Sequence, residues 1–177
     1  KIITATTWAK KIPVWEENLN LFPKEILDKI EDINLNFPQR QLTTEFDNLK
    51  DSFYKTIDFN KRFDILTHDV EDCHSDHTAL AKAAKGMYKY CNRFVAIYSP
   101  SSANFNPNYF IGLDEDTYKL KKITLDKYDI QNEQSYTKLG YYLQSEEHYN
   151  IGRAHVLENY VFDDYKNYEI YKIIKWL

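Results

Sequence analysis

The sequence predicts an α+β fold, with N-terminal helices, one strand–helix–strand unit and a mixed, mainly antiparallel sheet. Three observations lead to this class. Apolar residues recur at helical spacing in the first third of the chain, a helical pattern in the middle lies between two short apolar runs, and alternating apolar residues fill much of the second half. With 177 residues, 43% of them hydrophobic and 28% charged, the chain is expected to form a single globular domain, 1–177.

The N-terminal part begins with a predicted strand, followed by a predicted helix. Residues 1–9, KIITATTWA, are rich in β-branched residues, which favour strands. Residues 22–38, FPKEILDKIEDINLNFP, predict a helix that begins at Pro23 and is closed by Pro38. Its apolar face consists of Ile26, Leu27, Ile30 and Ile33.

Residues 43–58, TTEFDNLKDSFYKTID, give the clearest helical pattern. Thr44 is suited to be the N-cap because its hydroxyl can accept a hydrogen bond from a free backbone N–H of the first turn. The apolar residues that recur at helical spacing are Phe46, Leu49, Phe53 and Ile57. We expect this helix and the preceding one to form an α-helical hairpin that packs on the rest of the chain.

The middle of the chain predicts a strand–helix–strand unit. Residues 62–70, RFDILTHDV, and 93–99, RFVAIYS, read as strands, and residues 75–91 between them as a helix capped by Ser75 or Asp76. The buried stripe of that helix is expected to be Leu80, Ala83, Ala84, Met87 and Cys91. Two strands joined by a helix are expected to pair in parallel, with a right-handed crossover.

The second half of the chain is predicted to be rich in strands. Strands are expected at residues 108–113, 117–125, 153–162 and 168–176, with a short helix at 136–144. The last two strands would form a closing hairpin. The loop at residues 100–108 carries Phe105, which is either an exposed recognition anchor or a core residue that folds back.

Composition and missing motifs argue against several classes of protein, although an enzyme that touches nucleic acid through one local patch stays open. The net charge of −4 disfavours binding to nucleic acid through bulk positive charge. There is no GxGxxG or GxxxxGK motif, and no apolar run approaches the roughly 18 residues of a membrane span. Two cysteines without a CxxC pair, and no recognisable signal peptide, favour a reducing cytoplasm. Because residue 1 is Lys and not Met, a removed export signal stays open as an alternative.

The densest chemical signal is THDVEDCHSDH, residues 67–77, in which three His, three Asp, one Glu and one Cys follow a predicted strand and enter a predicted helix. Such side chains are ligands for a divalent metal such as zinc. The candidate ligands are His68, Asp72, His74 and His77. The alternative is a structural one. Asp72, Ser75 and Asp76 would then cap the helix, and His77 would belong to its buried stripe.

A second hypothesis is a cysteine nucleophile at Cys73, just before a helix, where the helix dipole lowers a thiol pKa. His155 and an acid after it, with Asp164 the chosen candidate beside Asp163 and Glu169, would complete a catalytic set. Three acidic neighbours oppose this activation because negative charge raises a thiol pKa; they are Asp69, Glu71 and Asp72. The alternative is an incidental cysteine.

One further polar face is predicted on the strand at residues 153–162. Arg153, His155 and Asn159 share that face, which is either the wall of a polar pocket or, more simply, the solvent side of a half-buried strand.

Two functions are suggested by these observations. The first is an acidic protein-binding module of the inhibitor or immunity type, which covers a macromolecular partner with a basic surface through the acidic stretch at residues 64–76. The 15 tyrosines and the lack of a catalytic motif favour it. The alternative is a hydrolase that uses either a divalent metal at His68, His74 and His77 or a thiol site at Cys73 and His155.

Overall fold

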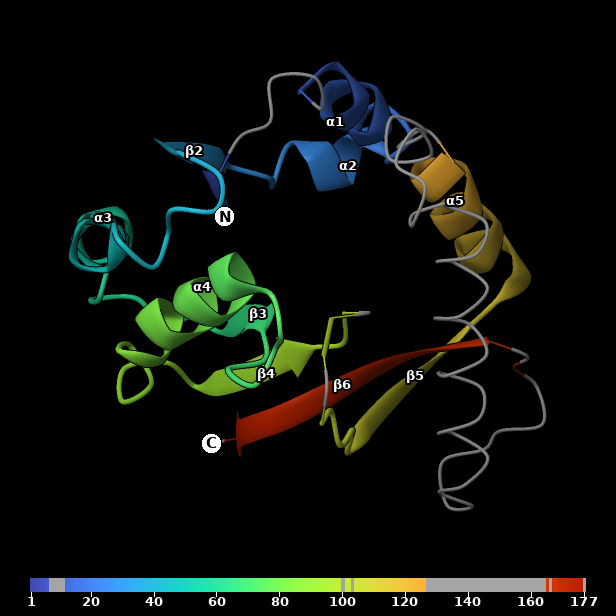
Figure 1. Ribbon diagram of the computed structural model, residues 1–177. Helices are drawn as coiled ribbons and strands as arrows, with labels where there is room; N and C mark the ends of the chain where they lie inside the picture. The colour runs from blue at the N-terminus through green and yellow to red at the C-terminus, as the bar shows by residue number, and fades with distance from the viewer. Residues whose placement is uncertain (7–11, 100, 103, 127–164, 166, 177) are drawn as a thin grey trace. The chain divides into compact units, whose positions relative to one another are not determined.

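The computed structural model describes residues 1–6, 12–99, 101–102, 104–126, 165 and 167–176 (Figure 1). In chain order the elements are β1 (Ile2–Thr6), α1 (Ile12–Leu19), α2 (Lys24–Leu27), β2 (Asp32–Phe37), α3 (Phe46–Thr56), β3 (Ile65–His68), α4 (Ser75–Lys85), β4 (Arg93–Ile97), β5 (Tyr109–Leu113), α5 (Glu115–Asp126) and β6 (Asn167–Trp176).

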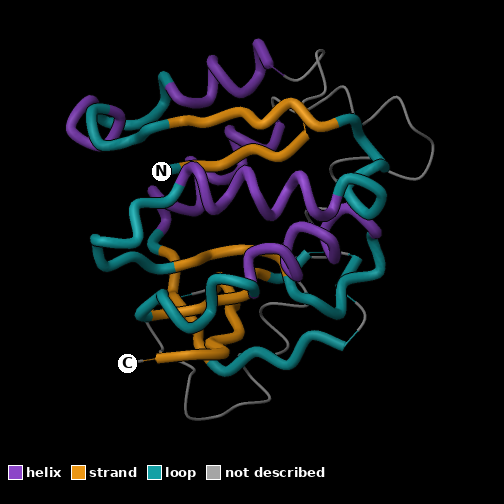
Figure 2. Tube along the Cα trace, turned by 90° about the vertical axis from the view of Figure 1, so that its left-hand side faces the viewer, coloured by secondary structure: helices purple, strands orange, loops and turns teal. Residues whose placement is uncertain are grey.

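The strands form two sheets. β1 pairs with β2 (Figure 2), and the other four have the order β3-β4-β6-β5. β3 and β4 pair in parallel with α4 between them in sequence, while β6 is antiparallel to β4. The predicted strand–helix–strand unit and the predicted α+β class are therefore confirmed.

The chain falls into two compact units. One comprises Ile3–Thr7, Asn34–Tyr109 and Ile170–Leu177, and we call it the site unit. Its core lies where α3 packs on α4 and α4 packs on β3. The buried apolar residues that pack together in this core are Ala5, Leu42, Leu49, Phe53, Ile65, Ala79, Ala83, Ala84, Met87, Cys91 and Phe94. No helix in the described ranges is both long enough and apolar enough to span a bilayer.

The helix predicted for residues 22–38 is wrong, and so is the helical hairpin. Only Lys24–Leu27 is helical, and Asp32–Phe37 is a strand. In DINLNF the apolar residues lie two apart, and Leu35 and Phe37 pack against the core while the alternate positions are exposed. This period of two fits a strand, and the intervening asparagines are weak helix formers.

The strand predicted for residues 117–125 is also wrong, because this segment lies in helix α5. The Asp114 side chain accepts a hydrogen bond from the Thr117 N–H at 2.8 Å, so it satisfies a free donor of the first turn. Glu115 and Asp116 lie in that turn, where negative charge is favoured.

The other predicted elements that fall on described residues are confirmed, with shifted ends and caps. Thr44 does not cap α3, since its hydroxyl donates to the Gln41 carbonyl. α4 ends at Lys85, short of the predicted 91. Phe105 is 4% exposed and packs on Tyr98, so its alternative as an exposed anchor is wrong. The short helix at 136–144 and the strand at 153–162, hence the closing hairpin, lie outside the described residues.

Candidate metal centre

The candidate site lies where β3 ends and α4 begins, on the loop at residues 69–74. Three backbone donors of this loop are satisfied within it. The Asp69 carbonyl accepts the Asp72 N–H at 3.2 Å, the Asp69 side chain accepts the Glu71 N–H at 3.1 Å, and the Asp72 side chain accepts the His74 N–H at 2.8 Å. Aspartate favours such turns because its carboxylate bonds to the backbone two residues ahead. The spacing of the acids thus folds the loop.

Asp72 is the centre of the site. Its side chain is completely buried, and its Oδ2 accepts hydrogen bonds from Ser99 Oγ at 2.5 Å and Ser102 Oγ at 3.4 Å. Burial acts to raise the pKa of Asp72, but hydrogen bonds from Ser101, Ser99 and the His74 N–H, with the charge of His77, outweigh it and lower the pKa to about 2. Asp72 is therefore a carboxylate at neutral pH.

His68 lies beside this carboxylate with its ring stacked on His77, the centroids 3.8 Å apart and the planes 5° from parallel. Burial, and then the nearby charge of His77, lower the pKa of His68 to about 4, although Asp72 acts against this shift. A neutral imidazole can offer a lone pair to a metal ion. Its Nδ1 is buried and has no hydrogen-bond partner in the described part of the chain, which is unusual for a buried polar atom.

His77 completes the group from the first turn of α4. Its Nδ1 lies 3.2 Å from Asp72 Oδ2 and 3.3 Å from Ser101 Oγ. Because both oxygens contact the same ring nitrogen, the arrangement is not a Ser-His-Asp triad, in which acid and nucleophile contact opposite nitrogens.

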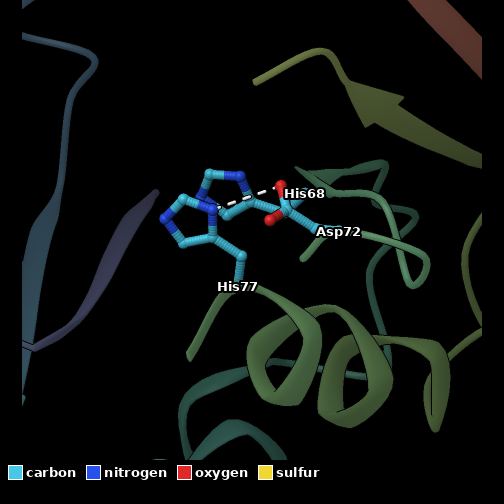
Figure 3. A group of neighbouring side chains, drawn as sticks. All are labelled: His68, Asp72 and His77. Atoms are coloured by element: carbon cyan, nitrogen blue, oxygen red, sulfur yellow. Dashed lines mark hydrogen bonds and ion pairs between the residues drawn. The ribbon is translucent and has the colours of Figure 1, made fainter. Parts of the chain in front are cut away.

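The three side chains together form a candidate metal-binding group. One ligand atom from each of His68, Asp72 and His77 lies within 4.8 Å of the others, and the two rings and the carboxylate converge in Figure 3. Zinc holds nitrogen and oxygen ligands at about 2.0–2.2 Å, which places tetrahedral donors about 3.3 Å apart. His77 Nδ1 and Asp72 Oδ2, which lie 3.2 Å apart, are already at this separation.

The fourth predicted ligand, His74, has a different structural role. It is the N-cap of α4, and its Nδ1 accepts the Asp76 N–H at 3.2 Å, so neither Ser75 nor Asp76 is the cap. Its ring packs on His77 at 4.4 Å. A neutral imidazole that accepts through Nδ1 carries its proton on Nε2 and has no free lone pair there. His74 therefore neighbours the group without joining it.

Asp76 and Asp69, the other aspartates of this stretch, are buried and bonded to protein groups. Asp76 accepts the Arg40 and Leu42 N–H groups at 2.6 and 3.3 Å. Asp69 forms an ion pair with Lys172 at 3.0 Å. Both are thus structural in this arrangement.

The described residues do not bring together the catalytic groups that the cysteine-nucleophile hypothesis requires. Cys73 is exposed, and its N–H donates to the Ser101 carbonyl at 2.8 Å. His155 and Asp164 lie outside the described residues, as do Arg153 and Asn159. Cys73 contributes no ligand atom to the metal-binding group.

Sequence reasoning missed the three serines, Ser99, Ser101 and Ser102. They follow β4, whose carboxyl end lies beside that of β3 because the two strands are parallel. Ligands often bind at this edge, so hydroxyls directly after the second strand were the available signal. No protein-family model matches this sequence, and no curated protein matches it.

Proposed function

We propose that the site unit binds a divalent transition metal such as zinc at His68, Asp72 and His77 and uses it for hydrolysis. The observation that carries the proposal is the convergence of two imidazoles and one carboxylate within 4.8 Å. The buried, unpartnered Nδ1 of His68 supports it, since a metal ion would satisfy that atom. Nitrogen-rich ligand sets favour zinc and its neighbours over magnesium and calcium.

Hydrolysis is the chemistry that such a ligand set suits. Three protein ligands leave one position of a tetrahedral ion for water, as in catalytic zinc sites, and the ion lowers the pKa of that water to about 7. The hydrogen bonds from Ser99 and Ser102 to Oδ2 orient the Asp72 carboxylate, which is the usual role of groups that surround ligands.

The first test is the metal content of the untagged protein, purified without chelator, followed by zinc titration. We expect about one equivalent of zinc in the wild type, and loss of binding in the His68→Ala, His77→Ala double variant. His74→Asn is the matched control, because asparagine preserves an N-cap and the residue lies outside the group. Absence of uptake in the wild type, or equal uptake in the double variant, contradicts the proposal. Hydrolase substrates would then be screened with the loaded protein.

A second candidate function is the protein-binding module of the inhibitor or immunity type. An apolar face of the four-stranded sheet supports it. Leu66, Val95 and Ile173 are in register on this face, and Leu66 is 63% exposed. Trp176, 58% exposed, packs near Tyr109 on the same sheet. Exposed apolar patches often mark interaction sites.

The partner of this second candidate would be recognised by apolar contact more than by charge. Asp69, Asp72 and Asp76 are buried, and Asp64 is paired with Arg93, so the acidic stretch offers little free charge to a basic surface. Its test compares the proteins bound by the wild type and by Leu66→Lys; equal binding by both contradicts it.

For either function we propose a reducing cytoplasmic setting, in agreement with the free Cys73 and Cys91 thiols.

A further inference from the structure

We infer that Lys172, on β6, is a positioning residue of the metal centre, which through Asp69 holds the loop that presents Asp72. This inference rests on the proposed metal-binding function. It assigns a role at the site to the C-terminal strand, which is far from the loop in the sequence. Lys172 contacts none of the three candidate ligands directly in the described structure, so it acts through its neighbour.

The contacts form a short chain from β6 to the site. Lys172 Nζ lies 3.0 Å from Asp69 Oδ2, with the Asp69 side chain 2% exposed and that of Lys172 27%. The other carboxylate oxygen of Asp69 accepts the Glu71 N–H, and its carbonyl accepts the Asp72 N–H. Asp69 therefore fixes the backbone on which Asp72 stands, and Lys172 fixes Asp69.

The sheet register explains why a lysine at this position reaches the loop. Thr67 on β3 pairs with Ala96 on β4, and Ala96 pairs with Lys172 on β6, so the three residues form one row across the sheet. Ala96 is completely buried and carries only a methyl group. Lys172 Nζ donates to Asp69 Oδ2 just beyond the end of β3, although β4 lies between β6 and β3 in the sheet.

Charge and positioning predict opposite effects when Lys172 loses its ammonium group. A positive charge near a cation site repels the ion, so its removal alone would strengthen metal binding. If Lys172 positions the loop, its removal releases Asp69 and disorders the Asp72 backbone, and metal binding weakens. The direction of the change therefore separates the two roles.

The experiment is a Co²⁺ titration of the full chain, followed by the visible absorption of the bound ion, which reports ligand geometry. We expect Lys172→Met to weaken Co²⁺ binding by about 10- to 100-fold, the usual effect of losing a group that orients a ligand, and to change the spectrum. Lys172→Arg should restore both. Arg93→Met is the matched control, because it removes the same charge from an exposed ion pair of the same sheet. It should leave affinity and spectrum unchanged.

A second variant covers the case in which Lys172→Met fails to fold with an unpaired buried carboxylate. In the Asp69→Asn, Lys172→Met double variant, the amide oxygen of the new side chain still accepts the Glu71 N–H, but the connection to β6 is lost. Weaker Co²⁺ binding in this variant supports the inference, and unchanged or tighter binding overturns it.

Amide hydrogen exchange distinguishes failure of this inference from failure of the proposed function. If the wild type takes up no Co²⁺, the proposed function fails, and the Glu71 and Asp72 amides still test the positioning role. Faster exchange of these amides in the double variant than in the Arg93→Met variant supports the positioning role of Lys172. Equal exchange overturns it.

Discussion

At the scale of single residues, burial of His68 gives the protein a specific pH dependence. Its pKa is about 4 in the folded chain against an ordinary value of 6.5, mainly because of burial. As pH falls, His68 is therefore protonated in the unfolded chain before it is protonated in the folded chain. The contribution of neutral His68 to the free energy of unfolding is fully present above pH 6.5 and is lost as pH falls toward 4. We expect a loss of up to about 3 kcal/mol in the free energy of unfolding across this window. Urea unfolding at several pH values measures it.

The control for this prediction is His68→Phe, which keeps a ring at the stacked position and cannot titrate. Its stability should change less between pH 6.5 and pH 4 than that of the wild type, and an equal change in both proteins contradicts the assignment. Asp72 contributes in a separate, lower pH range. Its pKa is lowered from the ordinary 3.8 to about 2, so its contribution to the free energy of unfolding is lost only as pH falls below 3.8 toward 2.

Asp76 is a second residue whose contacts predict a measurable cost. Its buried carboxylate accepts the N–H groups of Arg40 and Leu42, and Arg40 has a positive φ of 61°, which is uncommon for a residue other than glycine. We expect Asp76→Ala to lower the free energy of unfolding by about 2–3 kcal/mol, since two backbone donors lose a charged acceptor. Chemical denaturation at neutral pH measures this loss. The exposed neighbour Ser75, changed to Ala, should cost well under about 1 kcal/mol; equal losses would contradict the role.

The sequence limits what can be predicted about single site residues. It placed the candidate ligands in residues 67–77, because strand, loop and helix signals all fell there. It did not separate His68, which joins the group, from His74, which caps the helix, since both are imidazoles beside acids. That choice depends on the path of the loop, which is set by Ser99, Ser101 and Lys172 from distant segments. Spacing along the chain carries no record of these contacts.

At the scale of elements, the alanines of α4 determine how closely the helix approaches its neighbours. Ala83 is 1% exposed within the core formed by α3, α4 and β3, whereas Lys82 beside it is exposed. We expect Ala83→Leu to destabilise the protein by about 1–3 kcal/mol because the core has no room for three more carbons. Lys82→Leu, the same new side chain one position away, should change stability by less than about 0.5 kcal/mol. Urea unfolding compares the two; similar losses would contradict close packing.

Whether a segment forms a helix or a strand was predictable where its apolar residues follow a single spacing. Phe46, Leu49, Phe53 and Ile57 have only helical spacing, and α3 is confirmed there. In residues 22–38 two periods overlap: Ile30 and Ile33 lie three apart, whereas Ile33, Leu35 and Phe37 lie two apart. The helical choice failed because pairing with β1 supplies hydrogen bonds that a local pattern does not show.

At the scale of the whole molecule, the fold class was predictable because it depends on the types and order of elements. The parallel pair of β3 and β4 followed from the helix between them, as the connection rules require. The separate pairing of β1 with β2 did not, because it joins distant residues through a segment with a misleading helical pattern.

The proposed metal centre connects the site to the stability of the whole folded chain. His68 ends β3, Asp72 lies in the loop that follows and His77 lies on α4, so their geometry exists only when these elements are folded together. An ion that binds only the folded state stabilises it by RT ln(1 + [L]/Kd), about 2.7 kcal/mol at a free concentration 100 times Kd. We expect zinc to raise the free energy of unfolding by this amount in the wild type, as measured by urea unfolding in a zinc buffer. The His68→Ala, His77→Ala variant should gain nothing, because its folded state has lost two of the three ligands. An equal gain in both proteins would mean that zinc binds elsewhere, since a gain at this site requires both imidazoles.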